Sequence, residues 1–185
     1  DPEWLDGMED LAFFYLDVIE HLGLGPVHLV GTSLGGWAAA EMAVRDPGAM
    51  RTLTLVAPAG VNVPGVPRGD LFMWSPEETA KKLFHDPVWA ERMPQPANDD
   101  ETMIALKNRM TTAKLGWSPR MHNPNLPKWL HRVKAPTLIL WGDDDRLLPV
   151  AFGEAYAQMI PDATLQIISA CGHLPHVEKQ EEFTE

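Results

Sequence analysis

Four short apolar runs, with helical segments between most of them, constrain the fold of this chain more than any other feature. The runs are rich in β-branched residues, as the buried strands of parallel sheets are. They cover residues 27–30, 52–56, 137–141 and 164–168. Apolar residues at helical spacing indicate helices over residues 9–21, 37–45 and 150–159. This alternation predicts an α/β fold with a mostly parallel sheet.

The stretch 60–132 interrupts this alternation, because it has no obvious strand. Ser75, Pro76 and Glu78 have the features of a helix start, with an N-cap, a proline at the first helical position and a capping-box acid. A longer helix is expected over residues 99–115. We therefore expect three regions, namely a core part at 1–59, a helical cap or lid at 60–132 and a second core part at 133–185.

Residues 31–35 form a G-x-S-x-G pattern between the first apolar run and a helix. A sharp strand-to-helix turn here would lift the hydroxyl of Ser33 clear of the backbone, and Gly31 and Gly35 are expected to remove side chains that would clash across it. The same turn would put the backbone N–H of Leu34 at a helix N-terminus, where an oxyanion is stabilised. A glycine-rich turn with an incidental serine would have the same pattern, so the interpretation depends on the rest of the chain.

Acidic residues and a histidine follow the last two apolar runs. A serine hydroxyl becomes a good nucleophile when a histidine takes its proton and an acid orients that histidine. Three consecutive acids stand at 143–145, and His173 follows the fourth run. The carboxyl ends of parallel strands meet at one edge of a sheet, where α/β proteins build their sites. Ser33, one of the acids and His173 are therefore expected to meet there.

Three segments resemble signatures of the α/β-hydrolase family, in the family's order. They are GTSLGG at 31–36, PTLILWGDDDRLLP at 136–149 and GHLPHVE at 172–178. The resemblance covers nearly the whole chain. It implies a mostly parallel sheet of the α/β-hydrolase type, in its C-terminal part, with a helical lid inserted between two core strands.

The resemblance also implies residue roles. The family pattern G-x-x-D-x-x-x-P assigns the catalytic acid to Asp145, with Asp144 as the runner-up, and the base to His173. His176 belongs to the start of the last helix, and Cys171 is interpreted as a packing residue. Leu34 is expected to supply one oxyanion-hole N–H.

A serine at the turn implies acyl transfer to water. We expect a serine hydrolase that cleaves a small carboxylic ester or related acyl compound through an acyl-enzyme. The nearest alternative is a carbon–carbon bond hydrolase of ring-cleavage products, although many of those carry Trp where Leu174 stands here. A ligand-binding protein that retains the triad, or an inert fragment, is the alternative from another class. Trp74, Trp117 and Leu174 are candidate pocket residues, although packing in the insertion's own core is the more common role for any single one of these tryptophans.

The chain departs from the family at its start. Members begin with several further strands and carry an early loop that donates a second oxyanion-hole N–H. No such segment precedes the helix predicted at 9–21. Residues 27–30 would then form an unpaired apolar strand edge, which favours aggregation. We therefore expect either a fragment of a longer protein or a homodimer in which a second copy covers this edge.

Charge and composition exclude several classes of partner. The chain has 15 Lys and Arg against 26 Asp and Glu, a formal net charge of −11. That charge disfavours nucleic acid and anionic membranes as partners. The apolar runs are too short to cross a bilayer, and one cysteine suits a reducing compartment, so a cytoplasmic location is expected. No cluster has the spacing of metal ligands, and neither a metal nor another cofactor is expected.

Overall fold

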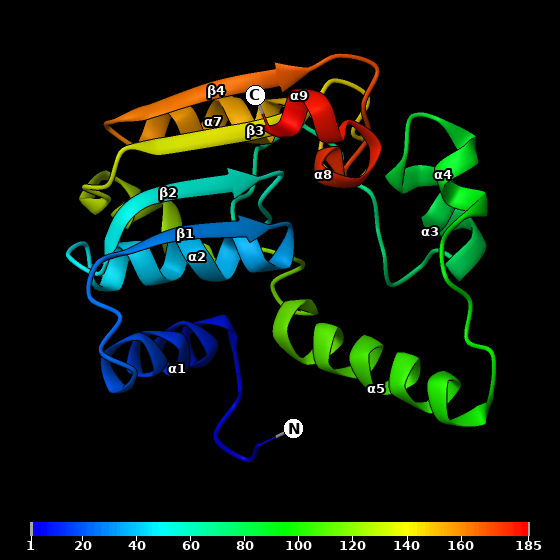
Figure 1. Ribbon diagram of the computed structural model, residues 1–185, viewed down its shortest axis with the longest axis horizontal. Coiled ribbons are helices and arrows are strands. Elements are labelled where there is room, and N and C mark those ends of the chain that lie inside the picture. Colours follow the sequence, from blue (N-terminus) through cyan, green and yellow to red (C-terminus); the bar gives the residue numbers. More distant parts are fainter. Residues whose placement is uncertain (1, 185) are drawn as a thin grey trace.

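The structure is a computed structural model that describes residues 2–184, and it contains a four-stranded parallel sheet (Figure 1). The strands follow the order β1-β2-β3-β4 and have these bounds: β1 Val27–Thr32, β2 Met50–Val56, β3 Thr137–Gly142 and β4 Ala163–Ile168. All three neighbouring pairs are parallel. The predicted α/β fold with a parallel sheet is confirmed.

Core helices precede, connect and follow these strands. Their bounds are α1 Met8–His21, α2 Leu34–Arg45, α7 Ala151–Met159, α8 Pro175–Glu178 and α9 Gln180–Thr184. Helix α2 packs on β1 and β2, and α1 packs on α2 on the side away from the sheet (Figure 1). Helix α7 contacts β3 and β4. The buried face of α2 is rich in alanine, which lets the helix lie close to the strands.

Two buried hydrogen bonds fasten loops at the carboxyl edge of the sheet to the core. The Trp141 indole donates to the carbonyl oxygen of Leu148 at 2.8 Å, and the Tyr156 hydroxyl donates to that of Ala59 at 2.5 Å. Both aromatic side chains are fully buried. Because buried polar groups lose free energy without a partner, these bonds fix the loops after β3 and β2 in one position.

The segment between β2 and β3 is helical, with these elements: α3 Pro76–Leu83, α4 Pro87–Glu91, α5 Asp99–Gly116, α6 Leu126–Trp129 and the 3₁₀ turn η1 Leu130–Arg132. As predicted, the Ser75 hydroxyl caps α3 by accepting from the Glu78 N–H at 3.1 Å. Leu126 and Leu130 are buried, and η1 contacts both α2 and α7. The end of this segment is thus packed into the core, which the sequence did not indicate. A lid role for the remainder stays a prediction.

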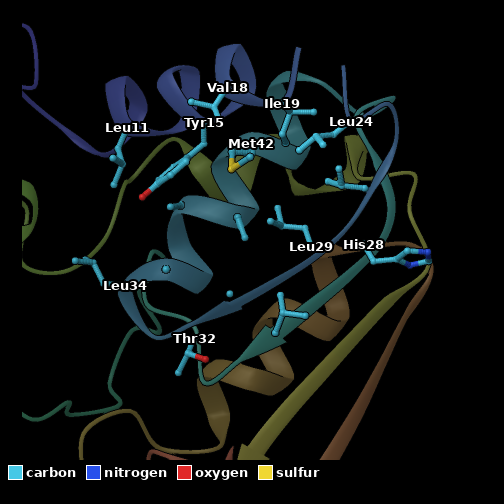
Figure 2. Close-up of a pocket in the computed structure, with 16 residues that line it drawn as sticks. Leu11, Tyr15, Val18, Ile19, Leu24, His28, Leu29, Thr32, Leu34 and Met42 are labelled. Atoms are coloured by element: carbon cyan, nitrogen blue, oxygen red, sulfur yellow. The ribbon is translucent and has the colours of Figure 1, made fainter. Parts of the chain in front are cut away.

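Among residues 2–184, strand β1 lies at one edge of the sheet and pairs only with β2. Val30 on this strand is 61% exposed. An apolar pocket of about 610 Å³ lies between β1, α1 and α2, with Leu11, Tyr15 and Val18 of α1 on one wall (Figure 2). That a second copy or a further segment covers this surface stays a prediction.

Within residues 2–184, none of the helices combines the length and apolar character needed to cross a membrane. The expected cytoplasmic location stays a prediction.

Candidate functional site

The backbone of Ser33 is strained. Its φ of 52° and ψ of −115° lie in a region that side-chain-bearing residues rarely adopt. Three hydrogen bonds hold it there: its N–H donates to the carbonyl oxygen of Val56 at 2.8 Å, and its carbonyl oxygen accepts from Trp37 and Ala59, each at 3.1 Å. Ser33 therefore occupies the sharp turn between β1 and α2 that the sequence predicted.

The turn requires glycine at two positions, one of which differs from our prediction. A Cβ at Gly31 would lie 2.5 Å from the carbonyl oxygen of Gly35, and a Cβ at Gly36 would lie 2.8 Å from the Cβ of Pro58. Both distances are far below van der Waals contact. A Cβ at Gly35 would meet nothing within 4 Å. The predicted steric need for Gly35 is wrong, because α2 turns that position outward.

Ser33, His173 and Asp145 form a continuous hydrogen-bonded series. The Ser33 Oγ lies 2.8 Å from His173 Nε2, and His173 Nδ1 lies 2.7 Å from Asp145 Oδ2. His173 is 1% exposed and Asp145 is 5% exposed. Asp145 Oδ1 also accepts from the backbone N–H groups of Leu147 at 2.9 Å and Leu148 at 2.8 Å. These bonds compensate the buried carboxylate and fix its orientation toward the imidazole.

The other two acids of the run point elsewhere. Asp144 Oδ2 lies 2.9 Å from His85 Nδ1 and 2.5 Å from Arg146 Nη2. Partial burial opposes ionisation of Asp144, but these hydrogen bonds outweigh it and lower its pKa. Asp143 is exposed and accepts from the Ser169 hydroxyl at 2.9 Å. Of the two candidates that the sequence left open, the structure brings Asp145, and not Asp144, to His173.

Cys171 and His176 lie beside this series without joining it. Cys171 is fully buried, and burial raises the pKa of its thiol to about 12, so the group is a neutral packing side chain. His176 lies in α8, as the sequence indicated. Its pKa is lowered, mainly by burial and to a smaller extent by the electrostatic effect of the neighbouring His173.

The loop that carries His173 rests directly on the junction between α3 and α4. The His173 N–H donates to the carbonyl oxygen of Leu83 at 2.7 Å. A Cβ at Gly172 would lie 2.4 Å from that same oxygen and 2.7 Å from the Cα of Phe84. Backbone therefore meets backbone here, which only glycine permits. A segment far away in the chain thus supports the histidine.

The buried carboxylate of Glu178 connects the same two segments. It accepts from the backbone N–H of Gly172 at 2.7 Å, of His85 at 3.1 Å and of Asp86 at 2.5 Å. Glu178 is 8% exposed. The sequence placed this residue in a family-like segment, GHLPHVE, but gave it no role. A glutamate at the end of a short helix carries no signal of its own, because its partners are backbone N–H groups, two of which lie in a distant segment.

We expect Glu178→Gln to lower kcat on the order of tenfold with little change in KM. The substituted amide keeps one acceptor and turns an N–H donor toward the backbone donors, so the His173 loop loses its fixed position, and small displacements of reacting groups are costly. Steady-state kinetics, run well below the Tm of both proteins, measures this effect. Glu181→Gln, at an exposed position, is the matched control. Equal kcat in the two variants would show that Glu178 does not position the histidine.

The candidate oxyanion donor lies where the sequence placed it. Leu34 is the first residue of α2, a position whose N–H has no partner within the helix. That N–H and the positive end of the helix dipole adjoin Ser33.

The candidate pocket residues do not line the small pocket beside Ser33. That pocket is formed by other residues, including Ala59, Arg68, Asp70 and Arg120. Trp74 packs its ring over Gly69, Trp117 is 54% exposed, and Leu174 packs against the core. A role in substrate binding for Trp74, Trp117 and Leu174 stays a prediction. In the described part of the chain, no group of three or more His, Cys, Asp or Glu residues could hold a metal ion.

The fold, and the meeting of a serine, a histidine and a carboxylate at the carboxyl ends of its strands, are those of the α/β hydrolases. Residues 1–185 match the family model described as "Alpha/beta hydrolase family". The chain therefore belongs to the alpha/beta hydrolase family.

Individual relatives differ in the reactions that their names state. A 2-hydroxy-6-oxo-6-phenylhexa-2,4-dienoate hydrolase of Comamonas testosteroni is 30% identical over 90% of this chain and 63% of its own length. A poly(3-hydroxyalkanoate) depolymerase of Ectopseudomonas oleovorans is 32% identical over 89% of this chain and 60% of its own. The crystal structure of a bacterial membrane phospholipase A superposes with a TM-score of 0.77 and 27% identity, covering 96% of this chain and 60% of that one. The chain thus spans about three fifths of the length of these relatives.

Proposed function

We propose that this chain carries the catalytic triad of a serine hydrolase that cleaves a small carboxylic ester or related acyl compound. The single observation that best supports the proposal is the series from the Ser33 hydroxyl through His173 to Asp145, with heavy-atom distances of 2.8 and 2.7 Å. Both distances lie within hydrogen-bond reach, which proton transfer from nucleophile to base requires.

In the proposed reaction, Ser33 Oγ attacks the carbonyl carbon of the ester and its proton passes to His173 Nε2. Asp145 accepts from Nδ1, keeps the ring in the required tautomer and stabilises the imidazolium. The Leu34 N–H donates to the oxyanion of the tetrahedral intermediate. As the intermediate collapses, His173 gives its proton to the leaving alcohol. Water, deprotonated by His173, then hydrolyses the acyl-enzyme and restores Ser33.

A carbon–carbon bond hydrolase of ring-cleavage products is the second candidate. The relative from Comamonas testosteroni, which hydrolyses a dienoate by name, supports it with 30% identity. The same serine and histidine would serve, because a ketone carbonyl can take the place of the ester carbonyl. The polyester depolymerase, at 32% identity, supports the ester hypothesis equally well.

Substrate comparison separates the two candidates. We expect measurable hydrolysis of p-nitrophenyl esters of short acyl chains, followed by the absorbance of the released p-nitrophenolate. For a vinylogous diketone acid, followed by loss of its visible absorbance, we expect a kcat/KM at least about tenfold lower, which corresponds to about 1.4 kcal/mol of transition-state stabilisation. The reverse order would assign the chain to the carbon–carbon bond hydrolases. The Ser33→Ala protein is the control, because any rate that it retains is background hydrolysis.

A further inference from the structure

Helix α2 carries a buried carboxylate that the proposed reaction does not use. Glu41 is 1% exposed and lies about two helical turns after Ser33. Its Oε1 accepts from the Trp37 indole N–H and from Asn123 Nδ2, each at 2.9 Å, and its Oε2 pairs with the Arg45 guanidinium. A buried carboxylate requires partners of this kind. Of these three partners, only Asn123 lies outside α2.

Asn123, in the loop between α5 and α6, is 8% exposed and joins three parts of the chain. Besides Glu41, its Nδ2 donates to Glu9 Oε1 of α1 at 2.9 Å, and its Oδ1 accepts from the Asn125 N–H at 2.9 Å. Its backbone N–H donates to the carbonyl oxygen of Gly60, in the loop after β2, at 3.0 Å. An aspartate in this position could not donate to either carboxylate, because only the amide has an NH2 group.

The loop after β2 links this contact to the nucleophile. Gly60 also donates its N–H to the carbonyl oxygen of Met121 at 3.1 Å, so two hydrogen bonds join the loops. Its φ is 105°, and a Cβ there would lie 2.5 Å from Trp37 Cδ1, so glycine is required where the loop lies against α2. The preceding residue, Ala59, donates its N–H to the Ser33 carbonyl oxygen at 3.1 Å. A series of contacts therefore runs from the buried carboxylate to the backbone of the nucleophile.

We infer that Glu41 and Asn123 are positioning residues for Ser33. Their contact fastens the loop after α5, and through Gly60 the loop after β2, onto the helix that begins at the nucleophile. Strained backbone persists only where its surroundings over-determine it. Loss of the contact frees the Ala59 N–H from the Ser33 carbonyl oxygen and lets the hydroxyl move relative to its base. The inference rests on the proposed function, because it concerns the nucleophile of that reaction.

Asn123→Asp tests the contact, because it keeps the shape of the side chain and removes its N–H donors. We expect kcat to fall about tenfold or more and KM to change less than about threefold, since the contact acts on Ser33 and not on the substrate. Steady-state kinetics with the better of the two substrates named above, run well below the Tm of each protein, measures both constants. Asn108→Asp, at an exposed position of α5, is the matched control and should leave kcat unchanged.

Combining Asn123→Asp with Glu41→Gln separates positioning from general damage to the core. The glutamine amide can donate to the new carboxylate, so the contact is restored with donor and acceptor exchanged. We expect kcat of the double variant to recover at least about threefold relative to Asn123→Asp alone, whereas two independent losses would add. A double variant that folds and has the kcat of Asn123→Asp, or a lower one, would contradict the inference.

Hydrogen exchange followed by NMR measures the link to Ser33 without relying on activity. Asn123→Asp should speed exchange of the Ala59 and Gly60 N–H groups about tenfold or more and leave exchange of the Thr137 N–H, in β3, unchanged. Unchanged exchange at Ala59 would overturn the inference even if kcat fell. If the unsubstituted protein hydrolyses neither substrate, the proposed function fails, and the exchange rates alone decide whether the contact fixes Ser33.

Discussion

Ser33→Ala is expected to abolish covalent labelling by a fluorophosphonate probe and to lower ester hydrolysis on the order of a millionfold. The probe reacts with an activated serine hydroxyl, and Ser33 Oγ, 2.8 Å from His173 Nε2, has a base in position to take its proton. Alanine removes the atom that would form the acyl-enzyme. Labelling followed by gel fluorescence and intact mass checks the first effect, and initial rates check the second.

The Ser33→Ala result is interpretable because the substitution leaves the turn intact. The φ of 52° at Ser33 is imposed by backbone hydrogen bonds, so an alanine at this position would adopt the same strained conformation and the Tm should change little. Ser118→Ala, at an exposed serine, is the control and should label fully. Undiminished labelling of the Ser33→Ala protein would show that Ser33 is not the nucleophile.

Asp145→Asn is expected to have the second largest effect, a fall in kcat on the order of ten thousandfold. The asparagine can still accept from the N–H groups of Leu147 and Leu148 through its carbonyl oxygen, as Asp145 Oδ1 does at 2.9 and 2.8 Å. Its amide then turns an N–H toward His173 Nδ1 and favours the wrong tautomer. The imidazolium also loses its carboxylate partner. Steady-state kinetics with a p-nitrophenyl ester measures the loss.

Asp144→Asn is the matched control, because it makes the same change one residue away. Asp144 pairs with His85 and Arg146, which are both substantially exposed. Such surface pairs contribute little free energy, so we expect less than about a threefold change in kcat. A larger loss from Asp144→Asn than from Asp145→Asn would reverse the assignment of the acid.

The elements of the core could be predicted because their signals are local. The apolar runs, the helical spacing between them and the Ser75 cap depend on residues that are close in sequence, and each reappears in the structure. The error at Gly35 has a physical cause. A five-residue motif does not show which side of the turn is crowded, and the crowding involves Pro58 of the following loop together with Gly31 and Gly36.

Patterns within the sequence were enough to predict the α/β class, the parallel sheet and the meeting of Ser33, an acid and His173 at one sheet edge. The last conclusion follows from the parallel sheet, whose strand ends share an edge. Three features became visible only in the folded chain. They are the acid that faces His173, the hydrogen bonds from Glu178 to backbone N–H groups 6 to 93 positions away, and the position of Arg68 and Arg120 beside Ser33. These contacts join segments distant in sequence, and their partners are often backbone atoms, which every residue possesses.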